Sequence, residues 1–215
     1  MLVADMDSTM IDVECIDELA DYAGVKAQVA AVTEKAMLGE LDFEGALDAR
    51  VALLKDLEES VIDRCREERV RLMPGARTLV QTMRGNGAYC LLVSGGFTRF
   101  AEPVAESIGF DEVASNTLLV EQGRLTGSVR KPIVDAHGKL EAMTRAASAR
   151  GIRLDQILAV GDGANDIPML AAAGLGIAYR AKPATAAAAD ARIDHNDLTA
   201  LLYAQGYKSS DWVTG

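Results

Sequence analysis

Hydrophobic residues follow two different patterns on either side of Pro74-Gly75. From about residue 14 to residue 71 they recur at helical spacing, and no segment there has the pattern of a strand. The repeats that predict successive helices are Ile16, Leu19 and Ala20, then Leu47, Val51 and Leu54, then Val61, Ile62 and Cys65. A short apolar segment at residues 1–4 precedes this stretch and predicts a buried strand that ends at Asp5.

After Pro74-Gly75, short apolar runs alternate with helical patterns. Continuous apolar runs such as residues 88–93 are typical of parallel strands that are buried on both faces. We expect helices over residues 76–84, 97–108, 136–149, 166–173 and 198–203, strands over 88–93, 157–160 and 176–179, and a hairpin formed by 116–120 and 124–129 about Gln122-Gly123. The alternation predicts an α/β fold with a doubly wound parallel sheet.

The helical stretch then forms a small cap inserted after the first strand. We expect an α/β catalytic core of residues 1–13 and 73–215 and a helical cap of residues 14–72. In doubly wound sheets, ligands bind at the carboxyl ends of the strands. Three predicted strands end in polar or glycine-rich turns, which are Asp5-Met6-Asp7-Ser8-Thr9, Ser94-Gly95-Gly96-Phe97-Thr98 and Gly161-Asp162-Gly163-Ala164-Asn165-Asp166. We therefore expect these turns to converge on one site.

Composition narrows the class of protein. The 215 residues are 49% hydrophobic and 25% charged, as in ordinary globular domains, and 22 basic against 32 acidic residues give a net charge of −10. That sign repels phosphate backbones and anionic lipid, so we expect neither a nucleic-acid nor a membrane partner. No apolar run approaches the roughly 18 residues of a membrane span, and we expect no secretory signal.

Cysteine and histidine usage bears on the compartment and the metal. The three cysteines are odd in number and widely spaced, which favours reduced thiols and a cytoplasmic protein. Only two histidines are present, so a zinc site built from His and Cys is implausible. Any metal should be a hard cation on oxygen ligands. The oligomeric state stays open.

The three turns offer the groups that phosphate chemistry needs. Asp5, Asp7 and Asp162 could supply the anionic oxygen ligands that Mg²⁺ prefers, although acids are also common in surface turns. The turn at Ser94-Gly95-Gly96 offers a hydroxyl and backbone N–H groups to an anion, or is an ordinary turn. Lys139 either brings a positive charge to the same site or is a solvated surface lysine.

These segments carry a family resemblance. In order and spacing, the turn at residues 5–9, the turn at 94–96, Lys139 and the turn at 161–166 resemble the four motifs of the haloacid dehalogenase-like phosphohydrolases. Further residues resemble the phosphoserine phosphatase members of that superfamily, namely Glu14, Phe43, Arg50, Ala173-Gly174-Leu175-Gly176-Ile177-Ala178-Tyr179 and Ala181-Lys182-Pro183. Many relatives in that family carry an additional N-terminal regulatory domain, so feedback regulation cannot be inferred from this chain.

The resemblance implies a role for each residue of the core motifs. Asp5 would be the nucleophile, and Asp7 would act as acid and then base, with a raised pKa. Mg²⁺ would be held by Asp5, Asp162 and the backbone carbonyl of Asp7. The remaining phosphate oxygens would be bound by Lys139, Ser94, Gly95 and Asn165. Asp166 would lie beside the metal.

The resemblance places substrate choice in the cap. Arg50 suits a bidentate contact to a carboxylate and Glu14 suits an ammonium group, so the pair matches an amino acid. Phe43 lies two helical turns from Arg50 and would share its face, and Met37 either lines the same pocket or packs the cap. Alternatively, Arg50 is an exposed helix residue paired with a neighbouring acid, Asp48 or Glu44.

The expected activity is that of an Mg²⁺-dependent phosphoserine phosphatase, which releases L-serine and phosphate through an aspartyl-phosphate in the last step of serine biosynthesis. One alternative is a phosphotransferase that passes the phosphoryl group to an alcohol such as homoserine. Another is a non-catalytic module that senses phosphate. The presence of Asp7 argues against the sensor, because binding alone needs no acid at that position.

Overall fold

The computed structural model describes residues 1–38 and 40–213 and is built on a six-stranded sheet in which every neighbouring pair is parallel. The strand order is β3-β2-β1-β6-β7-β8, so the first strand lies near the middle of the sheet. The strands are β1 (Leu2–Ala4), β2 (Cys90–Phe97), β3 (Glu112–Asn116), β6 (Leu158–Gly161), β7 (Leu175–Tyr179) and β8 (Ala191–Ile193). The parallel α/β sheet expected from the alternation is confirmed.

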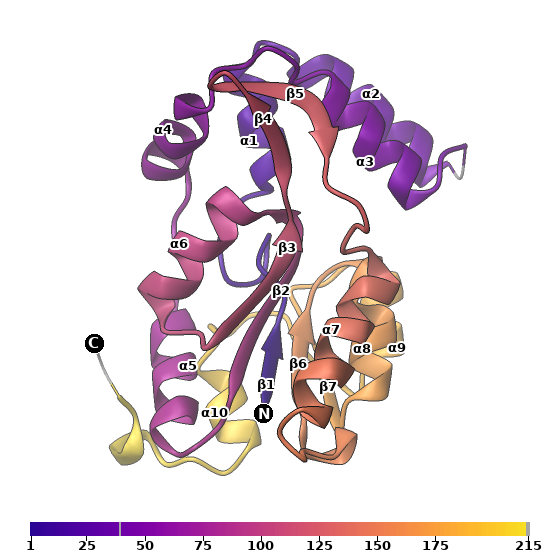
Figure 1. Cartoon of the computed structure of the whole chain (residues 1–215). Helices are drawn as coiled ribbons and strands as arrows, with labels where there is room; N and C mark the ends of the chain where they lie inside the picture. Colours follow the sequence, from indigo (N-terminus) through magenta and orange to yellow (C-terminus); the bar gives the residue numbers. More distant parts are fainter. Residues whose placement is uncertain (39, 214–215) are drawn as a thin grey trace.

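Helices cover both faces of the sheet (Figure 1). One face carries α5 (Ala76–Gly85), α6 (Thr98–Ile108) and α10 (Ala200–Ala204), and the other carries α7 (Ala136–Ser148), α8 (Ile167–Ala172) and α9 (Pro183–Ala188). The pleat of β1 divides the core, because Leu2 and Ala4 pack in one hydrophobic cluster and Val3 packs in the other. Burial on both faces explains why β1, β2 and β6 contain continuous apolar runs.

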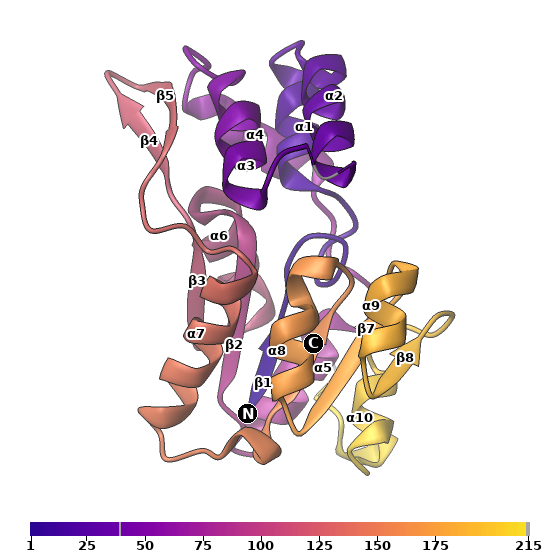
Figure 2. The same cartoon turned by 90° about the vertical axis from the view of Figure 1, so that its right-hand side faces the viewer.

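The helical stretch predicted as a cap stands over the carboxyl ends of the strands (Figures 1 and 2). It contains α1 (Cys15–Tyr22), α2 (Lys26–Met37), α3 (Phe43–Ala52) and α4 (Ser60–Arg69). The chain enters and leaves this region through adjacent segments, since Ile11 and Leu72 form an antiparallel bridge and Met73 donates its backbone N–H to Met10. The helices are therefore an excursion from the core with neighbouring ends.

A hairpin from the second half of the chain joins these helices. It consists of β4 (Leu118–Glu121) and β5 (Arg124–Val129) and lies beside α3 (Figure 2). Three backbone hydrogen bonds of 2.9 Å tie it to the segment between α3 and α4: Asp56 to Leu125, Leu125 to Leu57, and Glu59 to Gly123. Residues 118–129, which the sequence analysis grouped with the core, thus pack on the helices above the sheet.

Two parts of the sheet differ from the prediction. The structure has strands β3 and β8 at the two edges, where the sequence analysis expected none, and Asn116 ends β3 instead of beginning the hairpin. Edge strands are short and partly exposed, so they lack the continuous apolar run that marks a central strand. In addition, β2 extends to Phe97 with a register shift between Val93 and Phe97, and this irregularity contains the glycine-rich turn.

Two further observations concern composition. Cys15, Cys65 and Cys90 are each buried and free, and none forms a disulfide. Within residues 1–38 and 40–213, no helix combines the length and apolar character that a bilayer crossing demands.

Candidate active site

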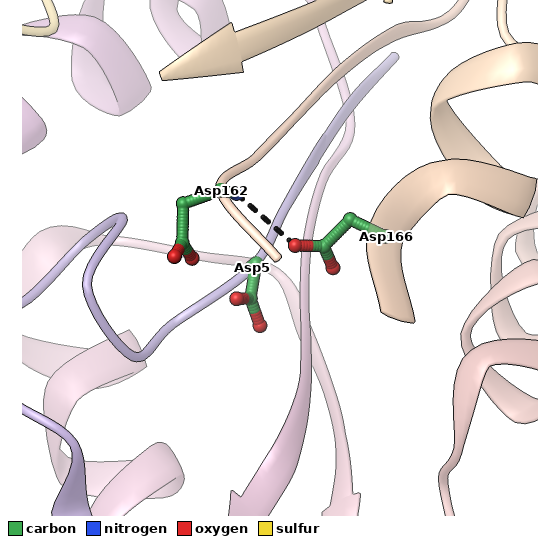
Figure 3. Close-up of side chains that lie close together, drawn as sticks. All are labelled: Asp5, Asp162 and Asp166. Atoms are coloured by element: carbon green, nitrogen blue, oxygen red, sulfur yellow. Dashed lines mark hydrogen bonds between the residues drawn. The ribbon is translucent and has the colours of Figure 1, made fainter. Parts of the chain in front are cut away.

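Two acidic residues meet because they follow adjacent strands. Asp5 follows β1 and Asp162 follows β6, and these strands pair in register with Ala4 opposite Val160. Asp166 lies four residues after Asp162, at the end of a short 3-10 turn, and reaches the same place. Oxygen atoms of Asp5, Asp162 and Asp166 all lie within 4.8 Å of one another, and all three residues are buried (Figure 3). The predicted convergence of the first and third turns is present in the structure.

Lys139 lies beneath this group and is completely buried, so it is not the solvated surface lysine of the alternative interpretation. Its Nζ atom donates to Asp5 Oδ1 at 2.6 Å and to Asp166 Oδ1 at 2.7 Å. Burial alone would lower the pKa of Lys139, but the two carboxylates outweigh that effect and the pKa is raised. The ammonium therefore stays charged, as a buried cation can when it is fully paired.

Asp166 organises the loop that carries Asp162. Its second oxygen, Oδ2, accepts a hydrogen bond from the backbone N–H of Asp162 at 3.1 Å (Figure 3) and another from that of Gly163 at 3.0 Å. A Cβ atom on Gly161 would lie 2.5 Å from the Asp166 carboxylate, so this close approach requires glycine. Thr9 donates to Asp162 Oδ1 at 3.3 Å. Both oxygens of Asp166 are thus engaged by the protein itself.

The site holds more negative than positive charge. Burial and then Asp166 raise the pKa of Asp5 well above its ordinary value, while burial and Asp166 raise the pKa of Asp162 to about 6. Within the described residues, Asp5 Oδ2 and Asp162 Oδ2 accept no hydrogen bond. One ammonium beside several carboxylates leaves an excess that a divalent cation on oxygen ligands would offset. The residues fit a hard metal ion.

Asp7 lies beside this group, and its carboxyl group is buried and has a raised pKa. Its Oδ1 atom is buried and finds no hydrogen-bond partner in the described part of the chain. Burial, and then the charge of Glu14, raise the pKa of Asp7 to about 7. A Cβ atom on Gly96 would lie 3.0 Å from both Asp7 Oδ2 and Ser94 Oγ, so the glycine lets the turn approach the acid. A carboxyl in this state can give or take a proton near neutral pH.

A cleft of about 380 Å³ separates the core from the helices above it. Its core wall is formed by Asp5, Asp7, Ser94, Gly95, Asp162 and Asn165, and its cap wall by Glu14, Phe43 and Arg50 together with Ile16, Ala36, Leu41, Ala46 and Leu47. All predicted site residues line the cleft except three. Lys139 and Asp166 are fully buried beneath it, and the side chain of Met37 lies outside the described part of the structure.

Two charged side chains define the polar part of the cap wall. Glu14 Oε1 accepts a hydrogen bond of 2.7 Å from Ser8 Oγ, which orients the carboxylate. Arg50 uses its Nε atom for the backbone carbonyl of Ala46 at 3.2 Å, and no carboxylate pairs with its guanidinium among residues 1–38 and 40–213. The acids that could have paired with Arg50, Glu44 and Asp48, bind Lys131 instead. The guanidinium is thus left available to the cleft.

Two contributors to the site were not assigned a role from the sequence. Thr9 lies in the first motif, in the turn after β1, and donates a hydrogen bond to Asp162, which follows the neighbouring strand β6. Lys182 lines the cleft, and its backbone N–H donates to the carbonyl of Asp162 at 3.1 Å. The only sequence feature that pointed to Lys182 was its place in the Ala181-Lys182-Pro183 segment, which resembles the family.

Residues 2–171 match the haloacid dehalogenase-like hydrolases, and the chain belongs to this family. Among its relatives, phosphoserine phosphatase SerB2 of Mycobacterium tuberculosis is 51% identical over 96% of this chain and 50% of its own length. A phosphoserine phosphatase of a Polaromonas species is 44% identical over 94% of this chain and 88% of its own.

A solved structure described as a phospho-aspartyl intermediate analogue of phosphoserine phosphatase has the same fold. It superposes with a TM-score of 0.88 at 38% identity, over 94% of this chain and 97% of its own. Several curated relatives are longer than the region they share with this chain, which spans 50 to 64% of the first four.

Proposed function

We propose that this chain is a phosphoserine phosphatase that hydrolyses O-phospho-L-serine to L-serine and phosphate through an aspartyl-phosphate. The observation that carries the proposal is the pairing of two walls across one cleft. Asp5 and Asp7 stand on the core wall, where a phosphoryl group would lie, and Glu14 and Arg50 stand on the cap wall. These charges complement a substrate with a phosphate at one end and an ammonium and a carboxylate at the other. The names of the relatives support the same substrate.

Asp5 is the proposed nucleophile because one of its carboxylate oxygens is held by Lys139 and the other is free among the described residues. Lys139 binds Oδ1 and fixes the carboxylate, while Oδ2 accepts no hydrogen bond from the described residues and is available to attack phosphorus. Attack forms the bond between Asp5 and phosphorus and breaks the bond between phosphorus and the serine oxygen. Asp7 in its protonated form gives its proton to that leaving oxygen, which releases serine.

The second half of the reaction uses the same acid in reverse. Asp7, now a carboxylate, takes a proton from a water molecule as the water oxygen attacks phosphorus. The bond between phosphorus and Asp5 breaks, and phosphate and the free Asp5 carboxylate result. A pKa of about 7 leaves both protonation states of Asp7 accessible at neutral pH, as this exchange of roles requires.

The proposed cofactor is Mg²⁺. The side chains of Asp5 and Asp162 and the backbone carbonyl of Asp7 would hold it, with Asp166 fixing the Asp162 loop from behind. The ion, when bound, neutralises negative charge on the phosphoryl oxygens. This assignment is supported by the excess of carboxylates over ammonium groups and by Asp162 Oδ2, which accepts no hydrogen bond from the described residues.

The remaining groups position the substrate. Ser94, the Gly95 backbone and Asn165 would bind phosphoryl oxygens from the cleft, and Lys139 would stabilise their charge from beneath. On the opposite wall, Arg50 would bind the serine carboxylate with its free fork, Glu14 would bind the ammonium, and Phe43 would pack on the carbon skeleton. We place this small-molecule substrate in the cytoplasm, in line with a role in serine biosynthesis and with the three free cysteines.

The proposal is tested by incubating the purified chain with O-phospho-L-serine and Mg²⁺ and measuring both products. We expect equal amounts of serine and phosphate, loss of turnover when EDTA removes the metal, and recovery when Mg²⁺ is restored. Asp5→Asn should lower kcat by about 10⁴-fold or more, because the nucleophile is gone. The exposed acid Asp155, replaced as Asp155→Asn, serves as the control.

Two outcomes would favour the alternatives. If homoserine in the assay is converted to its phosphate ester faster than phosphate is released, the chain is a phosphotransferase. If beryllofluoride stabilises the chain while neither product forms, the chain is a phosphate sensor. Turnover that survives Asp5→Asn would exclude the aspartyl-phosphate route.

A further inference from the structure

A buried side chain outside the family motifs connects two phosphate-binding elements. Asn116 is the last residue of β3 and is only 2% exposed. Its Nδ2 atom donates to the carbonyl of Gly95 at 2.9 Å and to that of Val134 at 3.3 Å, and its Oδ1 atom accepts from the N–H of Val134 at 2.7 Å. Both N–H donors and the carbonyl of the amide are used, and a flipped amide would oppose all three partners.

The bond to Gly95 sets the direction of the next peptide group. The Gly95-Gly96 peptide bond is trans, so its carbonyl and N–H point in opposite directions. While the carbonyl is held by Asn116, the N–H of Gly96 donates to Ser94 Oγ at 2.8 Å. Because Ser94 Oγ receives that hydrogen, its own proton is free to be donated. Within the described residues no acceptor takes it, and Ser94 lines the cleft.

The bonds to Val134 extend the same control to Lys139. Val134 directly precedes Asp135, whose side chain caps the start of α7 by accepting from Gly138 N–H at 2.8 Å. The backbone N–H of Lys139 then bonds to the carbonyl of Asp135. A single amide thus fixes the distance between the turn that carries Ser94 and the helix that carries Lys139.

Resting on the proposed function, we infer that Asn116 is a positioning residue for phosphoryl transfer, which acts by orienting the hydroxyl of Ser94 toward the transferred phosphoryl group. Asn116 itself does not line the cleft. It forms no hydrogen bond with the side chains proposed to bind the serine moiety, which stand on the opposite wall. Its removal should therefore impair the chemical step and leave recognition of the serine moiety intact.

The test compares Asn116→Ala with Ser115→Ala, a control on the same strand whose hydroxyl donates one hydrogen bond among the described residues, to Thr98. For Asn116→Ala we expect kcat to fall about 10²-fold, the order found when one oriented donor is lost. KM for phosphoserine and inhibition by L-serine should change less than about threefold, while inhibition by vanadate weakens in parallel with kcat. Ser115→Ala should leave all four quantities near their wild-type values.

A double-mutant cycle separates positioning from general loosening of the fold. If Asn116 acts through Ser94, adding Asn116→Ala to Ser94→Ala should cost much less than Asn116→Ala costs alone. Full additivity of the two losses, or an unchanged kcat in Asn116→Ala, would overturn the inference. An inactive wild-type chain would instead reject the proposed function.

Asn116→Asp covers the case in which the alanine variant does not fold. It keeps the size of the side chain but places a carboxylate against two carbonyl oxygens. Its activity relative to wild type should rise as the pH is lowered from about 8 to about 6, because a protonated carboxyl regains one donor. A flat ratio across that range would also count against the inference.

Discussion

Two lysines that each bind two carboxylates show how the two walls of the cleft differ. On the core side, Lys139 is fully buried with Asp5 and Asp166, at 2.6 and 2.7 Å. On the cap side, Lys131 binds Glu44 and Asp48 of α3 at 2.7 and 2.9 Å, but its side chain is 43% exposed. A buried pair cannot be broken without stranding charge, whereas an exposed pair exchanges readily with water. The proposed nucleophile is thus held by a buried ion pair, whereas the helix that carries Phe43 and Arg50 is joined to Lys131 by exposed ion pairs.

The largest effect should follow removal of the buried lysine. Lys139→Ala leaves the carboxylates of Asp5 and Asp166 without their cation, so we expect loss of about 3 kcal/mol of unfolding free energy and of nearly all turnover. Denaturant unfolding measured in EDTA, together with the phosphate-release assay, checks both. A variant with wild-type stability would show that this pairing does not hold the core wall together.

The next effect should appear on the cap wall and depend on the substrate. Arg50→Ala removes the proposed carboxylate contact, so kcat/KM for phosphoserine should fall about 10²-fold. Phosphoethanolamine lacks that carboxylate, and its kcat/KM should hardly change. Arg64→Ala, an exposed arginine elsewhere on the cap, is the matched control. Equal losses on both substrates would place Arg50 in another role.

A smaller effect concerns the pH dependence of stability without metal. In the folded chain the pKa of Asp7 is raised from 3.8 to about 7. The folded chain therefore keeps a proton on Asp7 at pH values at which the unfolded chain has already lost it. The stability supplied by this group is therefore complete below about pH 4 and is lost as the pH rises to 7. Asp7→Asn should melt several degrees higher than wild type above pH 7, and the difference should vanish near pH 4.

This prediction is checked by calorimetry in EDTA across that pH range, with Asp155→Asn as the control. Parallel pH profiles for wild type and Asp7→Asn would contradict it. If Asp7→Asn melts at a lower temperature than wild type above pH 7, the ionised Asp7 carboxylate stabilises the fold and the prediction has the wrong sign.

The smallest effect should follow removal of the exposed lysine. Lys131→Ala should lower the free energy of unfolding by less than about 1 kcal/mol, and less again at high salt, because solvent screens its two ion pairs. We expect kcat/KM for phosphoserine to change by less than about threefold. Denaturant unfolding at low and high salt measures the first quantity. A loss comparable to that of Lys139→Ala would remove the contrast between the walls.

Much of the architecture could be predicted because the central strands are buried on both faces. The runs that became β1, β2 and β6 are apolar throughout, and each leads into a polar turn. Parallel strands bring those turns to one edge of the sheet, so the meeting of Asp5 with Asp162 followed from topology alone. The motifs then indicated the family that the comparisons show.

The rest could not be predicted because it depends on contacts between distant segments. The burial of Lys139 is decided by Asp5 and Asp166, and nothing beside it in the sequence distinguishes it from a surface lysine. The edge strand β3 has no apolar run, so Asn116 was assigned to the hairpin and its bonds to Gly95 and Val134 stayed hidden. Residues 118–129 lie far in sequence from the helices on which they pack.

The attachment of the β4–β5 hairpin has a consequence for protein engineering. The helices leave and re-enter the core at the Ile11–Leu72 bridge, so they look exchangeable as one insertion. A graft limited to residues 14–72 would nevertheless sever the three backbone hydrogen bonds to the hairpin. Substrate range in this scaffold is therefore transplanted only when two stretches of chain, remote from one another in sequence, are moved together.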